Sequence, residues 1–411
     1  MPRLAPEVRQ YALITGNYWA FTLTDGALRM LVVLHFHQLG YGPLQIALLF
    51  LFYEIFGVVT NLVGGWLGAR IGLNRTMNIG LALQVAALVM LAVPVAWLAI
   101  PWVMAAQALS GVAKDLNKMS AKSSIKLLVP DSVQGSLFRW VAALTGSKNA
   151  LKGVGFFLGG VLLGTIGFRG AVLAMAGALL LVWLASLVLL RRDFGKASAK
   201  PKFRQMFSKS RAINVLSAAR LYLFGARDVW FVVALPVFLA TVLGWQYRSI
   251  GAFMAAWVIG YGIVQAATPR FTAVRERSPE RAQAFGWGAL LALLPAGMAI
   301  ALMLGKWPVQ TVVIAGLGLF GVLFAINSSL HSYLIVSHAN TDGVSLDVGF
   351  YYMANAMGRL VGTVLSGAVY QVAGLVACLW ISAGFVAISA LIMLALPAHA
   401  REHAGGSGAT R

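Results

Sequence analysis

Long apolar segments recur along the whole chain, and this repetition restricts the fold more than any other feature. Each segment has about 20 residues or more, the length that a helix needs to cross a hydrocarbon core of about 30 Å. We place twelve of them near 11–38, 43–68, 76–97, 101–125, 136–164, 169–190, 213–242, 248–270, 284–303, 308–335, 346–372 and 375–396. Because 60% of the residues are hydrophobic and only 11% are charged, the sequence predicts an all-α polytopic membrane protein.

The basic residues between the segments predict the orientation of the chain. With both termini in the cytoplasm, the inner loops and tails hold 20 Lys and Arg residues, whereas the outer loops hold only Arg169, Arg248 and Lys306. Cytoplasmic loops of membrane proteins are enriched in Lys and Arg in this way. We therefore expect twelve transmembrane helices with both termini cytoplasmic, and the N-terminal residues do not read as a cleaved signal peptide.

A basic polar break from Arg191 to Arg211 falls near the middle of the chain. It predicts four parts, namely an N-terminal six-helix half (1–190), a basic cytoplasmic linker (191–212), a C-terminal six-helix half (213–396) and a cytoplasmic tail (397–411). The halves look like repeats. A shift of 207 residues pairs Lys152, Gly155, Gly160 and Gly167 with Arg359, Gly362, Gly367 and Gly374, and a shift of 204 pairs Gly40 with Gly244. Such a parallel repeat of six helices resembles the major facilitator superfamily.

The segment GGWLGARIGLNR, from Gly64 to Arg75, resembles the signature of the loop between helices 2 and 3 in that superfamily. Its matching residues are Gly65, Leu67, Arg70, Gly72 and Arg75. The resemblance implies a gating turn that includes Arg70 and Arg75. Ala69 stands where an acidic residue is usual, which puts in question the salt bridge that this acid normally makes between the halves.

Thirteen charged residues lie within the predicted helices, where ionisable groups are costly and face a partner or a water-filled cavity. The third, sixth, ninth and twelfth helices carry none of them, as expected if every third helix faces lipid and the others surround a cavity. Even if every acid pairs with one cation, five positive charges remain. The cations are Arg29, Lys114, Lys118, Lys122, Lys148, Lys152, Arg220, Arg227 and Arg359, and the acids are Asp25, Glu54, Asp115 and Asp228.

The depth and spacing of these cations predict an anion site. At about 1.5 Å per residue, Lys118 and Lys152 lie about 24–25 Å along their helices, and each has a second lysine four residues earlier on the same face. Lys122 and Lys126 are expected at a solvated helix end. The predicted substrate-binding residues are Lys114, Lys118, Lys148, Lys152, Arg227 and Arg359, with Asn117 and Asn355 as candidates to orient substrate oxygens.

The alternative to an anion site is internal pairing of these charges. Asp115 can reach Lys118, and Asp25 can reach Arg29 on the same helix. Arg359 could pair with Asp347, whereas Arg227 and Asp228 are adjacent and are expected to face different directions.

Six further residues are predicted to act in coupling or gating: Asp25, Arg29, Glu54, Asp228, Arg70 and Arg75. Asp25 and Glu54 are the acids of the first two helices, so they are the candidates to carry protons. The sequence leaves open whether transport would be driven by proton antiport or by the membrane voltage alone.

Motifs for other functions are missing from the sequence. It has no P-loop, nucleophile elbow, HExxH motif or dinucleotide fingerprint, so we expect neither an enzyme nor a bound cofactor. A single cysteine, Cys378, excludes a cysteine-rich metal site, and we expect no metal and no nucleic-acid partner. The expected partners are a small anionic substrate and membrane lipid.

Five stretches closely resemble one family within the superfamily, the bacterial organoarsenical efflux permeases. They are residues 15–37, 50–80, 108–130 (ALSGVAKDLNKMSAKSSIKLLVP), 143–160 and 212–237. The resemblance implies a bacterial inner-membrane transporter that exports 1-arseno-3-phosphoglycerate and confers arsenate resistance. It also implies a functional partner, a glyceraldehyde-3-phosphate dehydrogenase that makes this compound. A carrier or exchanger for other organic phosphates, and a non-transporting membrane receptor, remain as alternatives.

Overall fold

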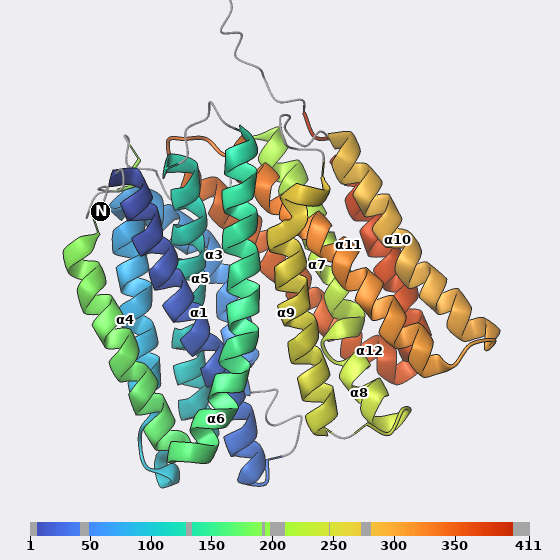
Figure 1. Ribbon diagram of the computed structural model, residues 1–411, viewed down its shortest axis with the longest axis horizontal. Coiled ribbons are helices and arrows are strands. Elements are labelled where there is room, and N and C mark those ends of the chain that lie inside the picture. Colours follow the sequence, from blue (N-terminus) through green and yellow to red (C-terminus); the bar gives the residue numbers. More distant parts are fainter. Residues whose placement is uncertain are drawn as a thin grey trace, which may run out of the picture.

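A computed structural model describes residues 6–41, 49–128, 134–190, 194–197, 210–245, 247–272 and 281–397. These residues form helices and connecting turns, without a strand, which confirms the predicted all-α class for the part of the chain that is described (Figure 1). In the N-terminal part, the helices are α1 (Pro6–Gln38), α3 (Leu51–Ile71), α4 (Leu73–Leu91), the short 3₁₀ helix η1 (Val95–Trp97), α5 (Ile100–Leu128) and α6 (Gln134–Leu189). In the C-terminal part, they are α7 (Arg211–Phe231), α8 (Ala234–Thr241), α9 (Tyr247–Phe271), α10 (Arg281–Leu304), α11 (Val309–His338) and α12 (Val344–Met393).

The two longest helices each turn back on themselves at a glycine. α6 has 56 residues and α12 has 50, and a straight helix of that length would be more than twice as long as a bilayer core is thick. α6 bends at Gly167 (φ 70°, ψ 175°), and α12 bends at Gly374 (φ 71°, ψ −173°). Only glycine adopts this conformation readily. The sequence repeat paired these two glycines, and they have the same backbone conformation.

The close helix contacts also repeat between the halves. In the N-terminal half, Gly155 of α6 packs on α1, and a Cβ atom at Gly155 would lie 2.6 Å from the carbonyl oxygen of Leu23. In the C-terminal half, Gly362 of α12 packs on α7, and a Cβ atom there would lie 2.6 Å from the carbonyl oxygen of Gly225. Small residues allow membrane helices to approach this closely. The α1–α6 pair and the α7–α12 pair are therefore built in the same way.

Seven helical stretches of the described chain are long and apolar enough to cross a membrane. They are Leu51–Ile71, Leu137–Leu189, Arg211–Thr241, Ala252–Arg270, Arg281–Leu304, Val309–His338 and Val344–Met393, of which the second and the last contain the glycine bends. The protein is therefore a multi-pass membrane protein. The count of twelve crossings, the cytoplasmic termini and the four-part division stay predictions, and much of the linker (191–193 and 198–209) and of the tail (398–411) lies outside the described residues.

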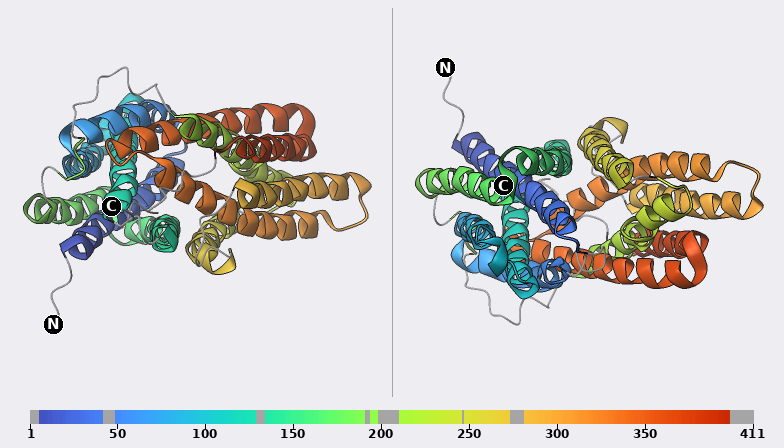
Figure 2. Two further views of the ribbon diagram at one scale, coloured as in Figure 1. Left: turned by 90° about the horizontal axis from the view of Figure 1, so that it is seen from above. Right: turned by 90° about the horizontal axis from the view of Figure 1, so that it is seen from below.

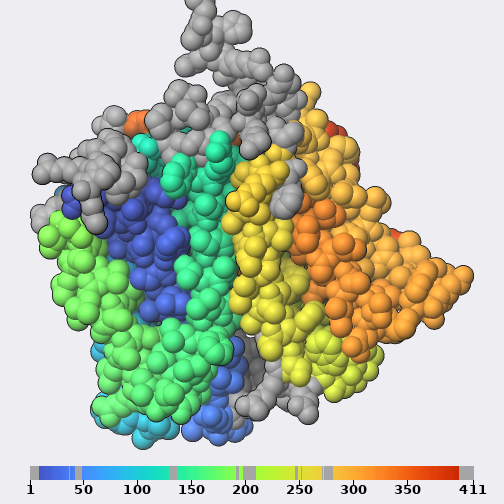
Figure 3. Space-filling view, viewed as in Figure 1, coloured from blue at the N-terminus to red at the C-terminus, as the bar shows by residue number. Residues whose placement is uncertain are grey.

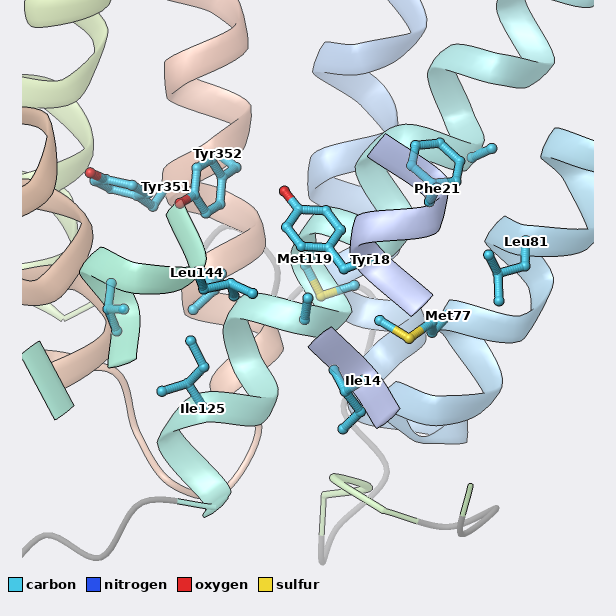
Figure 4. Close-up of a cluster of buried hydrophobic side chains, with 14 of the residues drawn as sticks. Ile14, Tyr18, Phe21, Met77, Leu81, Met119, Ile125, Leu144, Tyr351 and Tyr352 are labelled. Carbon is cyan, nitrogen blue, oxygen red and sulfur yellow. The ribbon is translucent and has the colours of Figure 1, made fainter. Parts of the chain in front are cut away.

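The two halves lie side by side (Figure 2), and at one end their side chains pack into a common hydrophobic core. At that end α11 and α12 bring Tyr333 and Tyr351 into one hydrophobic core with Ile125 of α5 and Phe138 of α6. The rings of Phe138 and Tyr333 are 5.0 Å apart. Figure 4 shows Tyr351 and Tyr352 beside side chains of the N-terminal half.

This packed end contains the C-terminus of α3 and the N-terminus of α12, which the sequence places in the cytoplasm. A Cβ atom at Gly349 of α12 would lie 2.6 Å from the carbonyl oxygen of Asn61, so the two backbones touch. In Figure 3, α6 and α9 lie against each other over much of their length, and toward the bottom of Figure 1 the ribbons of these two helices separate.

Candidate substrate site

Charged side chains from both halves meet on the inner faces of six helices. These are the six helices to which the sequence assigned charges, and most of the pairs described below join different helices. The residues are Asp25 and Arg29 of α1, Glu54 of α3, Lys114, Asp115 and Lys118 of α5, Lys148 and Lys152 of α6, Arg227 and Asp228 of α7, and Arg359 of α12. We call this group the central cluster.

Glu54 connects the two halves within the central cluster. Its Oε1 atom accepts a hydrogen bond from Nη2 of Arg29 (3.2 Å) in the same half and from Nη2 of Arg359 (3.1 Å) in the other half. The side chains of all three residues are 27–29% exposed, so water and solutes can reach them. One carboxylate held by two arginines from opposite halves is an arrangement that a bound anion could also adopt.

Asp228 anchors the arginines of the C-terminal half. Its Oδ1 accepts a 2.5 Å bond from Nε of Arg227, and its Oδ2 accepts a 3.2 Å bond from Nε of Arg359. The expectation that Arg227 and Asp228 face different directions is therefore wrong. Pairing of Arg359 with Asp347 does not occur either, because Arg359 binds Asp228 and Glu54, while Asp347 accepts a bond from the backbone N–H of Asn340.

Asp115 holds the two lysines of α5, as the internal-pairing alternative predicted for Lys118. Its carboxylate lies 2.5 Å from Nζ of Lys118 and 3.7 Å from Nζ of Lys114. The same two ammonium groups lie over aromatic rings, Lys114 over Tyr53 at 3.8 Å and Lys118 over Tyr352 of α12 at 4.6 Å. Such cation–π contacts stabilise a positive charge.

The lysines of α6 have weaker partners. Nζ of Lys152 is 3.9 Å from Oδ2 of Asp25, whose Oδ1 accepts a 2.7 Å bond from the hydroxyl of Tyr53. The sequence suggested Arg29 as the partner of Asp25. In the structure Asp25 pairs with Lys152 instead, and Arg29 binds Glu54. Nζ of Lys148 donates to Oδ1 of Asn149 at 3.3 Å, and no carboxylate among the described residues pairs with it.

The two asparagines of the prediction lie at the margin of the central cluster. Asn117 is fully buried; its Nδ2 donates to the carbonyl oxygen of Ala113, and it packs against Gly80 of α4, a helix without a central charge. Asn355 accepts a 2.9 Å bond from Nε of Arg220. The structure therefore places neither amide next to the paired lysines.

Two cations were misjudged from the sequence. Lys122 was expected at a solvated helix end, but it is only 2% exposed and donates to Oγ1 of Thr145. Arg220 was not among the predicted site residues, yet it is 3% exposed between α7, α11 and α12. The sequence did contain a signal for Lys122, because this lysine continues the four-residue spacing of Lys114 and Lys118.

Tyr53 is a further residue of the site, and it contacts Asp25, Arg29 and Lys114. No spacing or charge pattern in the sequence indicated this role.

The signature turn between α3 and α4 lies apart from the central cluster. Arg70 is exposed and stacks over Trp66 at 5.0 Å, and Arg75 is exposed at the start of α4. Ala69, which replaces the usual acid, accepts a backbone hydrogen bond from Ala197. Ser345 of the other half donates to the carbonyl oxygen of Gly65 at 2.8 Å. At this position the halves are joined by a neutral hydrogen bond and close backbone contact.

The central cluster has a surplus of positive charge. It contains seven cations and four acids, and each acid lies within 4 Å of at least one cation. A local surplus of positive charge attracts anions. No group of three or more potential metal ligands occurs among the described residues. The arrangement is therefore suited to holding a small polyanion between the halves.

Comparison with solved structures places this architecture among membrane transporters. The human organic anion transporter MFSD10 (TETRAN) superposes with a TM-score of 0.72 at 17% identity, over 95% of this chain and 100% of that one. A bacterial homologue of the iron transporter ferroportin in an outward-facing state gives 0.71 at 14% identity, over 93% and 98%. The E. coli fucose:proton symporter FucP gives 0.73 at 13% identity, over 95% and 99%. At these identities the likeness concerns the fold.

The sequence comparison identifies the family. No curated protein is similar enough in sequence to match the chain. The family model described as Major Facilitator Superfamily, in contrast, matches residues 14–346, which is most of the chain. This match agrees with the repeated halves, the glycine bends and the solved transporters of the same fold. The chain belongs to the major facilitator superfamily, and it is a transporter of that superfamily.

Proposed function

We propose that this transporter exports a small organic polyanion from the cytoplasm, and that the anion is 1-arseno-3-phosphoglycerate. The observation that carries the proposal is the positive surplus of the central cluster, which is contributed by both halves and is partly exposed. Such a compound has a phosphate and an arsenate group at its two ends and up to about four negative charges. Charge-assisted hydrogen bonds to oxyanions are the strong kind, so this site would favour it over neutral solutes.

The two halves would bind the two ends of the substrate. Lys114, Lys118, Lys148 and Lys152 offer mobile ammonium groups from the N-terminal half, and Arg227 and Arg359 offer planar guanidinium groups from the C-terminal half. Glu54 now occupies Arg29 and Arg359, so an incoming oxyanion would compete with its carboxylate. Displacement of Glu54 from Arg359 would break the ion pair that joins the halves within the central cluster.

The arsenic-containing substrate and the partner enzyme rest on the sequence resemblance to organoarsenical efflux permeases. A glyceraldehyde-3-phosphate dehydrogenase would form the compound from arsenate, and the permease would remove it across the bacterial inner membrane. Export of an anion is favoured by a negative cell interior, at about 2.3 kcal/mol per charge per 100 mV. Proton antiport through Asp25 is the second driving force that we consider, and we favour it slightly because Asp25 has only a long ion pair, 3.9 Å, with Lys152.

The test uses arsenic-sensitive bacterial cells that express the permease with and without the dehydrogenase. We expect arsenate resistance only when both proteins are present, because the permease has no substrate without the enzyme. The Lys118→Gln variant with the dehydrogenase serves as the control for transport through the central cluster. Resistance from the permease alone, or none with both proteins, would contradict the proposal.

A carrier for other organic phosphates is the second candidate. The same surplus of positive charge favours it, because phosphate and arsenate groups have the same shape and similar charge. Uptake of labelled 3-phosphoglycerate into everted membrane vesicles separates the two functions. An exporter of the arsenylated compound alone should transport 3-phosphoglycerate poorly, whereas a general carrier should transport it without any arsenate.

A further inference from the structure

A groove of about 560 Å³ lies on the outer face of the helix bundle, and α1, α6 and α9 form its walls. Figure 3 shows this face, where the part of α6 before its bend lies between α1 and α9. Among the described residues that line the groove, none belongs to the central cluster. Because α1 and α6 belong to the N-terminal half and α9 belongs to the C-terminal half, an occupant of the groove touches both halves.

Small residues of α6 and α9 form the floor of the groove. Gly146 and Ala150 of α6 and Gly262 of α9 line it, and at this level the two helix backbones touch. A Cβ atom at Gly262 would lie 2.7 Å from the carbonyl oxygen of Gly146. Small residues allow membrane helices to approach this closely. Because they have little or no side chain, the surface above this contact between the halves is hollow.

Large apolar side chains form the walls of the groove. On the α1 side, the indole N–H of Trp19 donates to Oγ of Ser147 (2.9 Å), and the rings of Tyr11 and Trp140 are 4.6 Å apart in edge contact. Trp19 and Trp140 are 42% and 39% exposed, and Ile263 on the α9 side is 60% exposed. Trp and Tyr are enriched where a membrane protein meets the lipid headgroups. These walls therefore suit the upper part of a lipid chain.

One charged residue lines the groove, Arg270 in the last turn of α9. It is exposed, and it forms no ion pair with the described residues. Ile263 lies seven residues earlier, about 10 Å deeper along the helix. Arg9 of α1 and Arg139 of α6 are exposed near the starts of their helices, at the same predicted cytoplasmic side. The groove thus has a positive entrance and an apolar interior, and basic pockets of this kind bind anionic lipid headgroups.

We propose that the groove binds one anionic phospholipid of the cytoplasmic leaflet, with its phosphate at Arg270 and an acyl chain over Gly146 and Gly262. Arginine holds a phosphate group with a planar fork of N–H donors. The aromatic wall and Ile263 contact the chain. Because the lipid touches both halves, it stabilises the conformation in which α6 and α9 are in contact at this level.

The experiment counts the lipids that the purified full-length protein retains in native mass spectrometry. Phosphatidylglycerol and phosphatidylcholine with the same acyl chains are added in equal amounts, and we expect the wild type to retain one phosphatidylglycerol in preference. Arg270→Gln should weaken the binding of phosphatidylglycerol about fivefold and leave that of phosphatidylcholine unchanged. Arg169→Gln is the matched control, because Arg169 is an exposed arginine beside the bend of α6, and it should keep the preference of the wild type.

A second variant tests the groove without changing its charge. Ala143 is an exposed residue of α6 that lines the groove, and Ala143→Phe should fill it and reduce the retention of both lipids. Phosphatidylglycerol should raise the unfolding temperature of the wild type in detergent more than that of Ala143→Phe or Arg270→Gln. Inorganic phosphate should not reproduce this difference, because it lacks the acyl chain.

Three results would overturn the proposal: equal retention of the two lipids by the wild type, undiminished retention of phosphatidylglycerol by Arg270→Gln, or the same stabilisation by inorganic phosphate. The last result would indicate a site for free anions. If Ala143→Phe does not fold, the comparison of Arg270→Gln with Arg169→Gln decides. The inference is independent of the transported substrate, because lipid retention is measured in its absence.

Discussion

Each half of the protein contains an aspartate that pairs with a cation on the neighbouring helix, but the two pairs differ in strength. In the N-terminal half, Asp25 of α1 lies 3.9 Å from Lys152 of α6. In the C-terminal half, Asp228 of α7 binds Arg359 of α12 at 3.2 Å and Arg227 at 2.5 Å. Lys152 and Arg359 are related by the sequence repeat. The helix pairs α1–α6 and α7–α12 repeat each other, but the ion pair in the first is long (loose) and the ion pairs in the second are short (tight).

The difference indicates a division of roles between the halves. Arginine holds two acceptors with a rigid fork, and Arg359 uses this fork to connect Asp228 with Glu54 of the other half. Lysine is a point charge on a flexible chain, so Lys152 can leave Asp25 at little cost. We infer that the Asp228–Arg359 pair stays formed during transport and serves as an anchor. The Asp25–Lys152 pair, in contrast, breaks and re-forms during transport.

The largest effect is expected from Asp228→Asn. This variant leaves Arg227 without its buried counter-charge and leaves Arg359 with Glu54 alone, and breaking a buried ion pair typically costs about 3–5 kcal/mol. Thermal unfolding of the protein in detergent should show a clear fall in stability, and transport should be lost. Asp25→Asn is the matched control in the other half, and it should be much less destabilising. Equal losses in both variants would refute the division into anchor and exchangeable pair.

Replacing the lysines of the central cluster is expected to cause a severe loss of transport with little loss of stability. Lys114, Lys118, Lys148 and Lys152 are each replaced by Gln, which keeps the length of the side chain and removes its charge. Substrate-dependent transport in everted vesicles should fall severely, about tenfold or more, for at least two of the four, because each lost cation removes a charge-assisted contact. Wild-type transport in all four variants would show that these lysines do not bind the substrate.

Exchange of the two cation types tests the comparison directly. Arg359→Lys keeps the charge but loses the fork that bridges Asp228 and Glu54, so we expect transport to fall about tenfold. Lys152→Arg in the other half should be tolerated better, because its pair is loose. The rate of transport in vesicles gives the measure. A fully active Arg359→Lys variant would mean that the fork is dispensable.

The smallest effect on transport is expected from Asp25→Asn, measured while the pH gradient or the membrane voltage is abolished. If Asp25 carries the proton, collapsing the pH gradient should reduce transport by the wild type, and Asp25→Asn should no longer respond to the gradient. Substrate flux in vesicles is measured while the pH gradient and the voltage are abolished separately. Transport that depends only on the voltage, and that persists in Asp25→Asn, would exclude the proton-carrier role.

Much of the central cluster was predictable because the relevant signals are local in the sequence. A four-residue spacing puts Lys114 and Lys118 on one face of α5, and the absence of charge from every third predicted helix identified the six helices that carry the central cluster. The bends at Gly167 and Gly374 were predictable for the same reason, since they fall in the short gaps between two apolar segments. Burial of Lys122 was missed because it depends on tertiary packing, including that of α6, whose Thr145 accepts its hydrogen bond.

The sequence alone determined that the chain crosses the membrane repeatedly, that its halves repeat and that cations outnumber acids within the helices. These features follow from hydrophobicity, helical periodicity and composition, which do not depend on distant contacts. Only the tertiary structure decided the partners: Asp25 with Lys152, Glu54 with Arg29 and Arg359, and Lys122 without a described counter-charge. The energy of an ion pair changes over a few ångströms, and those distances are set by the rotation and packing of helices that are far apart in the chain.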